Sequence, residues 1–341
     1  MKAMVVNKWG ERSELQDVQV PEPEPGEALM QVRAAGVGLT LLNMRTGRSG
    51  GTTPRIMGHE LGGDIVAVGD HVTNVKVGDR CSVYFYLTCG HCRWCRGGRE
   101  TLCEDLFGHV GVHRDGGFAE YVALPAENFI PIPDGLDYEA AAIAADAVNT
   151  NWHCMKLRAR VTPHDTVLLI GAGGGVGIHG VQMAKLFGAR VIAADVSDEK
   201  LDLARRWGAD EVINVRSTPD VVAEAKRLTD GRGVDAAVDY VGNGLSFQSA
   251  IESLGKGGRA VIIGAAGGDT TFTARNLIQG EQEVMGSRHS TRREFIETME
   301  LMARGLITPV VGKRTHFTEV ESIFDDIIAE RLLGRGALTY E

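Results

Sequence analysis

The feature that most constrains this fold is an alternation of buried strands and helices that begins at residue 166. The run Thr166–Ile170 is almost wholly apolar, as a strand buried on both faces of a parallel sheet must be. A glycine-rich turn follows, and apolar residues then recur at helical spacing along residues 178–187. A strand, a tight turn and a helix, repeated along the chain, predict a doubly wound parallel sheet and an α/β fold.

The alternation continues to residue 287. Further strands are predicted at 191–194, 212–215, 234–241, 260–263 and 284–287, with helices at 198–207, 221–228 and 246–254. The chain before about residue 147 has short extended runs broken by proline and glycine, which predicts a β-rich unit. A helical stretch at 294–303 leads back to it. We therefore expect a parallel-sheet domain over 148–287 and a β-rich domain over 1–147 and 288–341.

The turn after the first buried strand reads GAGGGVG and departs from the strict G-x-G-x-x-G spacing, with Ala172 in the first place. Small residues let the backbone approach a pyrophosphate, and the N-terminus of the following helix stabilises its charge. A purely structural glycine turn is the alternative. We expect a dinucleotide to be bound by Gly171, Gly173, Gly174, Gly175, Val176 and Gly177.

Asp195 ends the second predicted strand, near the place about 20 residues on where a ribose-binding acid is expected. A carboxylate there accepts hydrogen bonds from the ribose hydroxyls and repels a 2′-phosphate. Val196 and Ser197 follow, with no arginine to hold that phosphate. The sequence therefore predicts NAD(H) rather than NADP(H), although Asp195 capping the next helix is the alternative. Lys200 and Arg335 are also expected to contact the cofactor.

Four of the six cysteines crowd into one short segment, as Cys89, Cys92, Cys95 and Cys103. Their C-x2-C-x2-C-x7-C spacing can place four thiolates around one tetrahedral Zn²⁺. A site closed by four protein ligands holds structure rather than doing chemistry. An iron–sulfur cluster or free thiols are the alternatives, and nothing nearby supports electron transfer. Cys81 and Cys154 are interpreted as buried thiols.

Composition excludes several classes of partner. The net charge is -9 and the basic residues are scattered, which argues against a nucleic acid or an anionic membrane surface as partner. The N-terminus has no signal-peptide pattern, and no stretch reaches the ~20 apolar residues of a membrane span. We expect a cytoplasmic protein that acts on a small molecule.

The sequence resembles the zinc-containing alcohol dehydrogenases of the medium-chain dehydrogenase/reductase superfamily along essentially its whole length. The resemblance rests on GHELGG, GDR, the cysteine segment, DGGFAEY, the dinucleotide turn with Asp195, and the tail GRGALTY. It implies a Rossmann domain over 148–287 and a GroES-like catalytic domain over the rest. It also implies a homodimer or homotetramer, which the apolar strand near 284–287 favours, because a sheet edge can pair with its copy.

The resemblance assigns catalytic roles to Thr40, His59, Glu60 and Asp146, with Thr40 as the relay hydroxyl. In that family a cysteine, the histidine of GHE and a further cysteine or aspartate hold a catalytic zinc. The cysteine position is Gly38 here, and glycine has no side-chain donor. The resemblance therefore implies an incomplete catalytic zinc site, with residual metal binding by His59 and Asp146, and with Glu60 as a further donor, left open. We expect the substitution Gly38→Cys to need little room and to restore a second zinc.

An incomplete site leaves three functions open. Alcohol and carbonyl interconversion is favoured, reduction of conjugated C=C bonds is the alternative, and a non-catalytic NAD(H)-binding protein is the third. Without a metal, hydrogen bonds must stabilise the developing charge. Tyr84 and Tyr86 are candidate donors if they point inward, and Phe85 and Trp152 are candidate apolar walls of the pocket.

Overall fold

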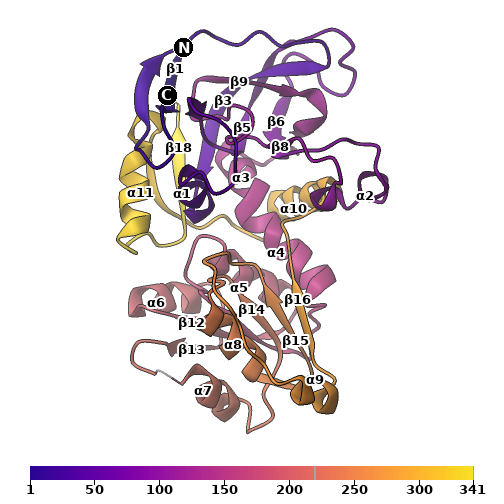
Figure 1. Cartoon of the computed structure of the whole chain (residues 1–341), viewed down its shortest axis with the longest axis vertical. Helices are drawn as coiled ribbons and strands as arrows, with labels where there is room; N and C mark the ends of the chain where they lie inside the picture. The colour runs from indigo at the N-terminus through magenta and orange to yellow at the C-terminus, as the bar shows by residue number, and fades with distance from the viewer. Residues whose placement is uncertain (219, 341) are drawn as a thin grey trace. The chain divides into compact units, whose positions relative to one another are not determined.

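The computed structural model describes residues 1–218 and 220–340, which form two compact units. Unit 2 spans Thr150–His289, and unit 1 consists of Met1–Asn149 together with the chain from Ser290 onward (Figure 1). The chain passes from unit 1 to unit 2 between residues 149 and 150 and returns between residues 289 and 290. Two crossings of the chain thus produce a unit assembled from both ends of the sequence.

Unit 2 is built on a six-stranded sheet with the strand order β13-β12-β11-β14-β15-β16. Every pairing in it is parallel. The predicted doubly wound sheet is therefore confirmed. The strands are β11 (Thr166–Ile170), β12 (Arg190–Asp195), β13 (Glu211–Asn214), β14 (Val234–Asp239), β15 (Leu254–Ile262) and β16 (Glu283–Gly286).

The helices of unit 2 follow the strands as predicted, with one addition. They are α5 (Gly177–Leu186), α6 (Asp198–Arg206), α7 (Val221–Leu228), α8 (Gly244–Glu252) and α9 (Ala274–Gly280). Leu168, Ile192 and Val234 of the sheet are fully buried in a core that α7 and α8 help to cover. Helix α9 is absent from the prediction because none of its residues is buried, so it has no apolar periodicity.

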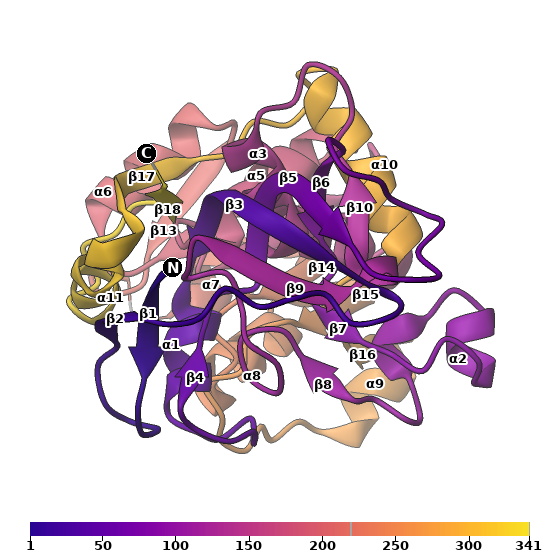
Figure 2. The same ribbon diagram turned by 90° about the horizontal axis from the view of Figure 1, so that it is seen from above.

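Unit 1 is β-rich, as expected. Its main sheet has the order β10-β6-β5-β3-β18-β17, and β9 also pairs with β3; Figure 2 shows β3, β5 and β6 side by side. Smaller sheets have the orders β2-β1-β4 and β7-β8. The strands are β1 (Lys2–Val6), β2 (Glu14–Asp17), β3 (Glu27–Val37), β4 (Arg55–Ile56), β5 (Glu60–Val68), β6 (Arg80–Val83), β7 (Tyr86–Leu87), β8 (Gly108–His109), β9 (Tyr121–Pro125), β10 (Phe129–Pro131), β17 (Val311–His316) and β18 (Arg335–Thr339).

The α-helices that begin in unit 1 range from 4 residues in α2 to 12 residues in α10. They are α1 (Leu39–Arg45), α2 (Arg93–Arg96), α3 (Tyr138–Ile143), α4 (Asn149–His153, which runs into unit 2), α10 (Arg292–Ala303) and α11 (Val320–Ile328). Between α3 and α4 the chain is π-helical over Ala144–Val148. A capping box of Thr291 and Glu294 starts α10, two residues before its predicted first residue. Throughout the described chain, each helix is too short or too polar to cross a bilayer.

His179 is a buried histidine in the first turns of α5. Its side chain is shielded from solvent, and Nδ1 lies 2.8 Å from the Gly175 carbonyl oxygen in the preceding turn. Burial lowers the pKa of His179 to about 4, because a charged imidazole would lose its hydration there. The folded protein therefore holds this ring in its neutral form at neutral pH.

We expect His179 to make the fold sensitive to acid. Its pKa is about 4 in the folded protein, below the ~6.5 of an unfolded histidine, so the unfolded state binds protons first as the pH falls. The contribution is complete above pH ~6.5, and between pH 7 and pH 5 it falls by about 2 kcal/mol. Urea unfolding of the parent and of His179→Gln at both pH values should show a smaller loss in the variant. His164→Gln, at an exposed position of the same unit, is the control and should behave as the parent; equal losses in all three proteins would contradict the prediction.

Candidate active site and metal centre

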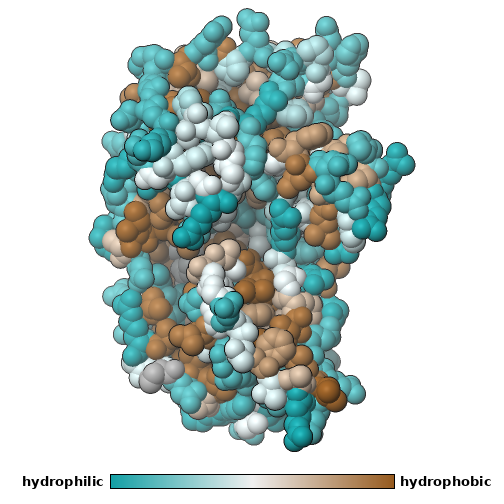
Figure 3. Space-filling view, viewed as in Figure 1, coloured by the Kyte–Doolittle hydropathy of each residue, from teal (hydrophilic) through white to brown (hydrophobic). Residues whose placement is uncertain are grey.

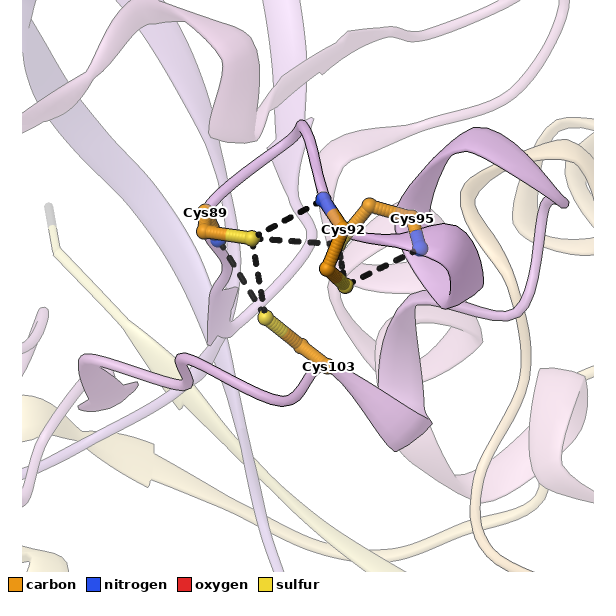
Figure 4. Close-up of side chains that lie close together, drawn as sticks. All are labelled: Cys89, Cys92, Cys95 and Cys103. Atoms are coloured by element: carbon orange, nitrogen blue, oxygen red, sulfur yellow. Dashed lines mark hydrogen bonds between the residues drawn. The ribbon is translucent and has the colours of Figure 1, made fainter.

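Four cysteines converge in the segment of unit 1 between β7 and β8, which includes α2 (Figure 4). The Sγ atoms are 3.5 Å apart for Cys92 and Cys95 and for Cys89 and Cys103, and 3.9 Å apart for Cys89 and Cys95. A tetrahedron with zinc–sulfur bonds of ~2.3 Å has edges of about 3.8 Å. The four sulfurs therefore fit one zinc ion, as their spacing in the sequence predicts.

Backbone N–H groups donate hydrogen bonds to three of these sulfurs, and such bonds favour the thiolate form. The N–H groups of Cys89, Cys92 and Cys95 donate to the Sγ atoms of Cys103, Cys89 and Cys92, at 3.3, 3.4 and 3.5 Å. The Cys95 N–H lowers the pKa of Cys92 to about 6, whereas burial raises the pKa of Cys95 to about 12. Four thiols this close can all ionise only with a cation among them. Because all four ligands come from the protein, none of the positions is left for a substrate.

A second polar cluster is buried in the same unit. His59 precedes β5, Glu60 begins it, and Asp146 lies in the π-helical segment. One ligand atom from each lies within 4.8 Å of the others. His59 Nε2 is 3.8 Å from Glu60 Oε1 and 3.5 Å from Asp146 Oδ2. The fold thus brings together three of the four residues to which the resemblance assigns catalysis.

Arg335 lies among these three side chains. It begins β18, and its Nη2 donates to Glu60 Oε1 and, at 3.1 Å, to Asp146 Oδ2, while Nε donates to Glu60 Oε2 at 3.2 Å. The side chain is 2% exposed. Burial lowers the pKa of Arg335 to about 9, which is still well above neutral pH. The guanidinium is therefore charged at neutral pH.

This placement corrects the expectation for Gly38→Cys. A Cβ atom built on Gly38 would lie 2.0 Å from Arg335 Nη1, so a cysteine at position 38 does not fit with little room. The cofactor contact expected for Arg335 stays a prediction; in this structure its guanidinium donates to Glu60 and Asp146. The expectation for Gly38 came from the local sequence, which does not show what fills the space beside it.

The buried cluster does not fit a second metal ion as it stands. Its carboxylates are hydrogen-bonded to the guanidinium, and a dication about 4 Å from that guanidinium would be repelled by about 8 kcal/mol at an effective dielectric constant of about 20. His59 is the one donor left over: within the described chain neither of its ring nitrogens has a hydrogen-bond partner. A single imidazole does not hold a zinc ion, which needs about three protein ligands.

The dinucleotide turn of unit 2 joins β11 to α5. Gly171 has φ +80°, a left-handed conformation that favours glycine. A Cβ on Gly177 would lie 2.1 Å from the Gly171 carbonyl oxygen, and one on Gly173 would lie 2.4 Å from Lys200 Cβ. The turn is therefore tight because the start of α5 packs on the end of β11, with α6 close beside it. Gly174, Gly175 and Val176 complete it, and Ile178 N–H donates to the Gly174 carbonyl oxygen at 3.0 Å.

Asp195 ends β12 and is bonded to that turn. Its Oδ2 accepts the Gly173 N–H at 2.8 Å and its Oδ1 accepts the Val196 N–H at 2.7 Å. Lys200 Nζ lies 3.8 Å from Oδ1. An ionised carboxylate has about four lone-pair sites, so both oxygens keep capacity for ribose hydroxyls. Ser197 rather than Asp195 caps α6, which removes the capping alternative for the aspartate.

The remaining predicted residues have mixed placements. Thr40 is partly exposed in the first turn of α1, and the Phe85 ring packs on His59 with centroids 4.3 Å apart. Tyr84 Oη donates to the Ser290 carbonyl oxygen at 3.0 Å, so its hydroxyl has a partner outside the buried cluster. Trp152 stacks on Phe187 of unit 2, 5.4 Å between centroids, which is the packing role weighed for it.

Known proteins share both units of this chain. The family described as "Alcohol dehydrogenase GroES-like domain" matches residues 24–134, and "Zinc-binding dehydrogenase" matches residues 175–304. An NAD-dependent alcohol dehydrogenase of Sulfurisphaera tokodaii is 34% identical over 99% of both chains, and an alcohol dehydrogenase of Geobacillus stearothermophilus is 35% identical over 98% of both. The solved alcohol dehydrogenase of Aeropyrum pernix has a TM-score of 0.92 at 31% identity, over 99% of this chain and 100% of that one.

The chain belongs to the zinc-containing alcohol dehydrogenase family of the medium-chain dehydrogenases/reductases. The resemblance inferred from the motifs is confirmed. The role of Arg335 inside the buried cluster is the functional feature that the sequence did not reveal. One sequence feature could have indicated it. Gly38 stands where the family has a cysteine, and the carboxylates of Glu60 and Asp146 need a cationic partner when they are buried.

The cysteine site is expected to hold about one zinc ion per chain and to carry stability. Cys95→Ser should lose that zinc and lower the thermal unfolding midpoint, because metal binding contributes to the free energy of unfolding. Mass-spectrometric metal analysis combined with thermal unfolding measures both. Cys154→Ala, a buried cysteine of unit 2, is the control and should keep its zinc. A zinc-free parent protein, or full zinc in Cys95→Ser, would sink this assignment.

Proposed function

We propose that this protein is an NAD-dependent alcohol dehydrogenase, which moves a hydride between nicotinamide and an alcohol or carbonyl substrate. The observation that carries the proposal is the hydrogen bond between Asp195 and Gly173, which places a carboxylate beside the dinucleotide turn. The full-length similarity to proteins named NAD-dependent alcohol dehydrogenase supports it. Unit 2 is the cofactor domain and unit 1 the catalytic domain in this proposal.

The choice of NAD over NADP follows from charge. A 2′-phosphate on the adenosine ribose would add negative charge next to Asp195, which is 6% exposed and therefore poorly screened by solvent. Lys200 Nζ lies 3.8 Å from Asp195 Oδ1, so part of its charge is already balanced by that carboxylate. A ribose with both hydroxyls free suits this carboxylate better, because each hydroxyl can donate to it.

Bound NAD⁺ supplies a hydride acceptor at its nicotinamide ring. Oxidation of an alcohol also releases the hydroxyl proton, so the chain must supply a route for it. Thr40 is the proposed relay, because its hydroxyl can accept and donate a proton and its side chain is partly exposed. His59, fully buried with its ring against Phe85, is proposed to donate to the substrate oxygen in the reverse direction.

A substrate and cofactor screen tests this proposal. The parent protein should turn over simple alcohols or carbonyl compounds with NAD(H), and should bind NADH more tightly than NADPH. Asp195→Ala should weaken NADH binding about tenfold, the effect of losing hydrogen bonds to a charged group, and NADPH binding less. Some loss for both cofactors is expected, because Asp195 also accepts the Gly173 N–H.

The control variant is Asp198→Ala, which removes an exposed carboxylate from the first turn of α6 and should leave the preference unchanged. Turnover of conjugated enones alone would show instead that the chain reduces C=C bonds. Nicotinamide binding without turnover of any alcohol, carbonyl compound or enone would support the non-catalytic alternative. Equal losses of NADH and NADPH affinity in Asp195→Ala would remove Asp195 from cofactor selection.

We also propose that the chain forms a homodimer or a homotetramer through unit 2. Strand β16 is an edge of the parallel sheet and pairs on its other side with β15. Figure 3 shows apolar side chains gathered over the region where Figure 1 places α8, and Leu245 of α8 is 79% exposed. An open sheet edge favours pairing with a second copy across a two-fold axis, and exposed apolar side chains elsewhere on the same unit favour association as well.

Sedimentation velocity at micromolar concentration should show a species of two or four chains. Met285→Lys places a charge on β16, and we expect it to shift the distribution to smaller species, because charged side chains block edge pairing. Val77→Lys, at an exposed position of unit 1, is the control and should sediment as the parent does. A parent protein that sediments as a single chain would refute the oligomer.

A further inference from the structure

We propose that the guanidinium of Arg335 is the resident cation of the buried cluster, occupying the place of a second metal ion, and that Gly38 provides the space for it. The inference concerns the metal content and packing of unit 1, and so it can fail or hold independently of the proposed dehydrogenase activity. It rests on the contacts of Arg335, on Gly36 of β3 and Gly38 just beyond the end of that strand, and on the charges of the cluster.

The first step is the reason for a glycine at position 38. Its backbone has φ -147° and ψ -179°, an extended conformation that any residue adopts. The backbone conformation therefore does not require glycine at position 38. The lack of space for a Cβ atom does. A Cβ would lie 2.0 Å from Arg335 Nη1, 2.2 Å from Cζ and 2.7 Å from Nη2. Moving the guanidinium away would cost free energy, because Glu60 and Asp146 would lose their buried cationic partner.

The second step is a matching glycine two positions earlier. Gly36 pairs with Glu60 across β3 and β5, and a Cβ on Gly36 would lie 2.1 Å from Glu60 Oε2. Positions two apart on a strand face the same side of the sheet. Gly38 lies one residue beyond the end of β3 and keeps an extended conformation, so Gly36 and Gly38 both leave space on the side where Glu60 and Arg335 form their ion pair.

The charge balance of the buried cluster also depends on Arg335. Glu60 and Asp146 together carry two negative charges in a volume where His59 and Glu60 have 0% exposed side chains. Arg335 contributes one positive charge, and its guanidinium donates hydrogen bonds to both carboxylates. A metal ion would need the same carboxylate oxygens as ligands. Guanidinium and metal are therefore mutually exclusive partners of this cluster.

Because guanidinium and metal exclude each other, single and double substitutions should change the metal content differently. Gly38→Cys alone adds a thiol to a position already filled by Arg335, so it should strain the fold without creating a metal site. Removing the guanidinium frees the oxygens of Glu60 and Asp146 and leaves His59 available as a third donor. A thiol and the loss of Arg335 together should therefore produce a second zinc site that neither change produces fully.

Zinc content and thermal unfolding of the full chain test the proposal. After incubation with zinc and desalting, the parent and Gly38→Cys should each hold about one zinc ion per chain, and Gly38→Cys should unfold at a lower temperature. The double variant Gly38→Cys/Arg335→Ala should hold about two. Adding His59→Ala to it should return the content to about one, which locates the second ion.

Arg314→Ala is the matched control, since it removes an arginine from the neighbouring strand β17 whose partner, Glu139, is at the surface of unit 1. It should keep about one zinc ion and nearly the parent's stability. Two tightly bound zinc ions per chain in the parent would overturn the proposal. So would a folded Gly38→Cys/Arg335→Ala variant that stays at one zinc ion.

A double-mutant cycle keeps the proposal testable if the cysteine variants do not fold. Gly38→Ala should lower the unfolding midpoint of the parent, because its methyl group meets the guanidinium, and should do so much less in an Arg335→Ala background. Additive effects of the two substitutions would show that Gly38 and Arg335 do not compete for space. That result would also overturn the proposal.

Discussion

The ion cluster of Arg335, Glu60 and Asp146 is the interaction on which the organisation of unit 1 depends. It joins residues 275 and 189 positions apart in the chain, and so it ties the C-terminal strand β18 to β5 and to the π-helical segment. Removing one member of such a buried pair typically costs 3–5 kcal/mol, because the remaining charge has no solvent to stabilise it. The cluster therefore links three distant segments of the chain, and losing any one member would leave a buried charge without its partner.

Unit 2 uses a carboxylate in a comparable way. Asp195 accepts a backbone N–H from the glycine turn and so fixes the end of β12 against the start of the dinucleotide site. The tightness of the turn follows from the same packing, because side chains on Gly173 or Gly177 would collide with their surroundings. The residue proposed to select the cofactor is thus also a residue that shapes the turn.

The parts of this structure that could be predicted are those whose signals are local. Thr166–Ile170 was predictable because a strand buried on both faces is continuously apolar, and the cysteine site because its ligands lie within one short segment. Helix α9 was not predictable, since none of its residues is buried and so no apolar face marks it in the sequence. The position of Arg335 was not predictable either, because no local pattern tells which distant side chain will fill the space beside a glycine.

Both polar centres of unit 1 need a cation to balance negative charge. The anions are thiolates in one centre and carboxylates in the other. Four cysteine sulfurs at the corners of a tetrahedron suit a soft, spherical dication, and no protein side chain can reach four such corners at once. Two planar carboxylates suit a guanidinium instead, whose forked donors lie in one plane and whose charge is permanent. A thiolate at position 38 would add a soft donor and a third negative charge, and both would favour zinc once Arg335 no longer fills the space. With glycine at position 38 and Arg335 in place, the oxygens match the arginine, so the donor set and the space beside it together decide which cation the fold holds.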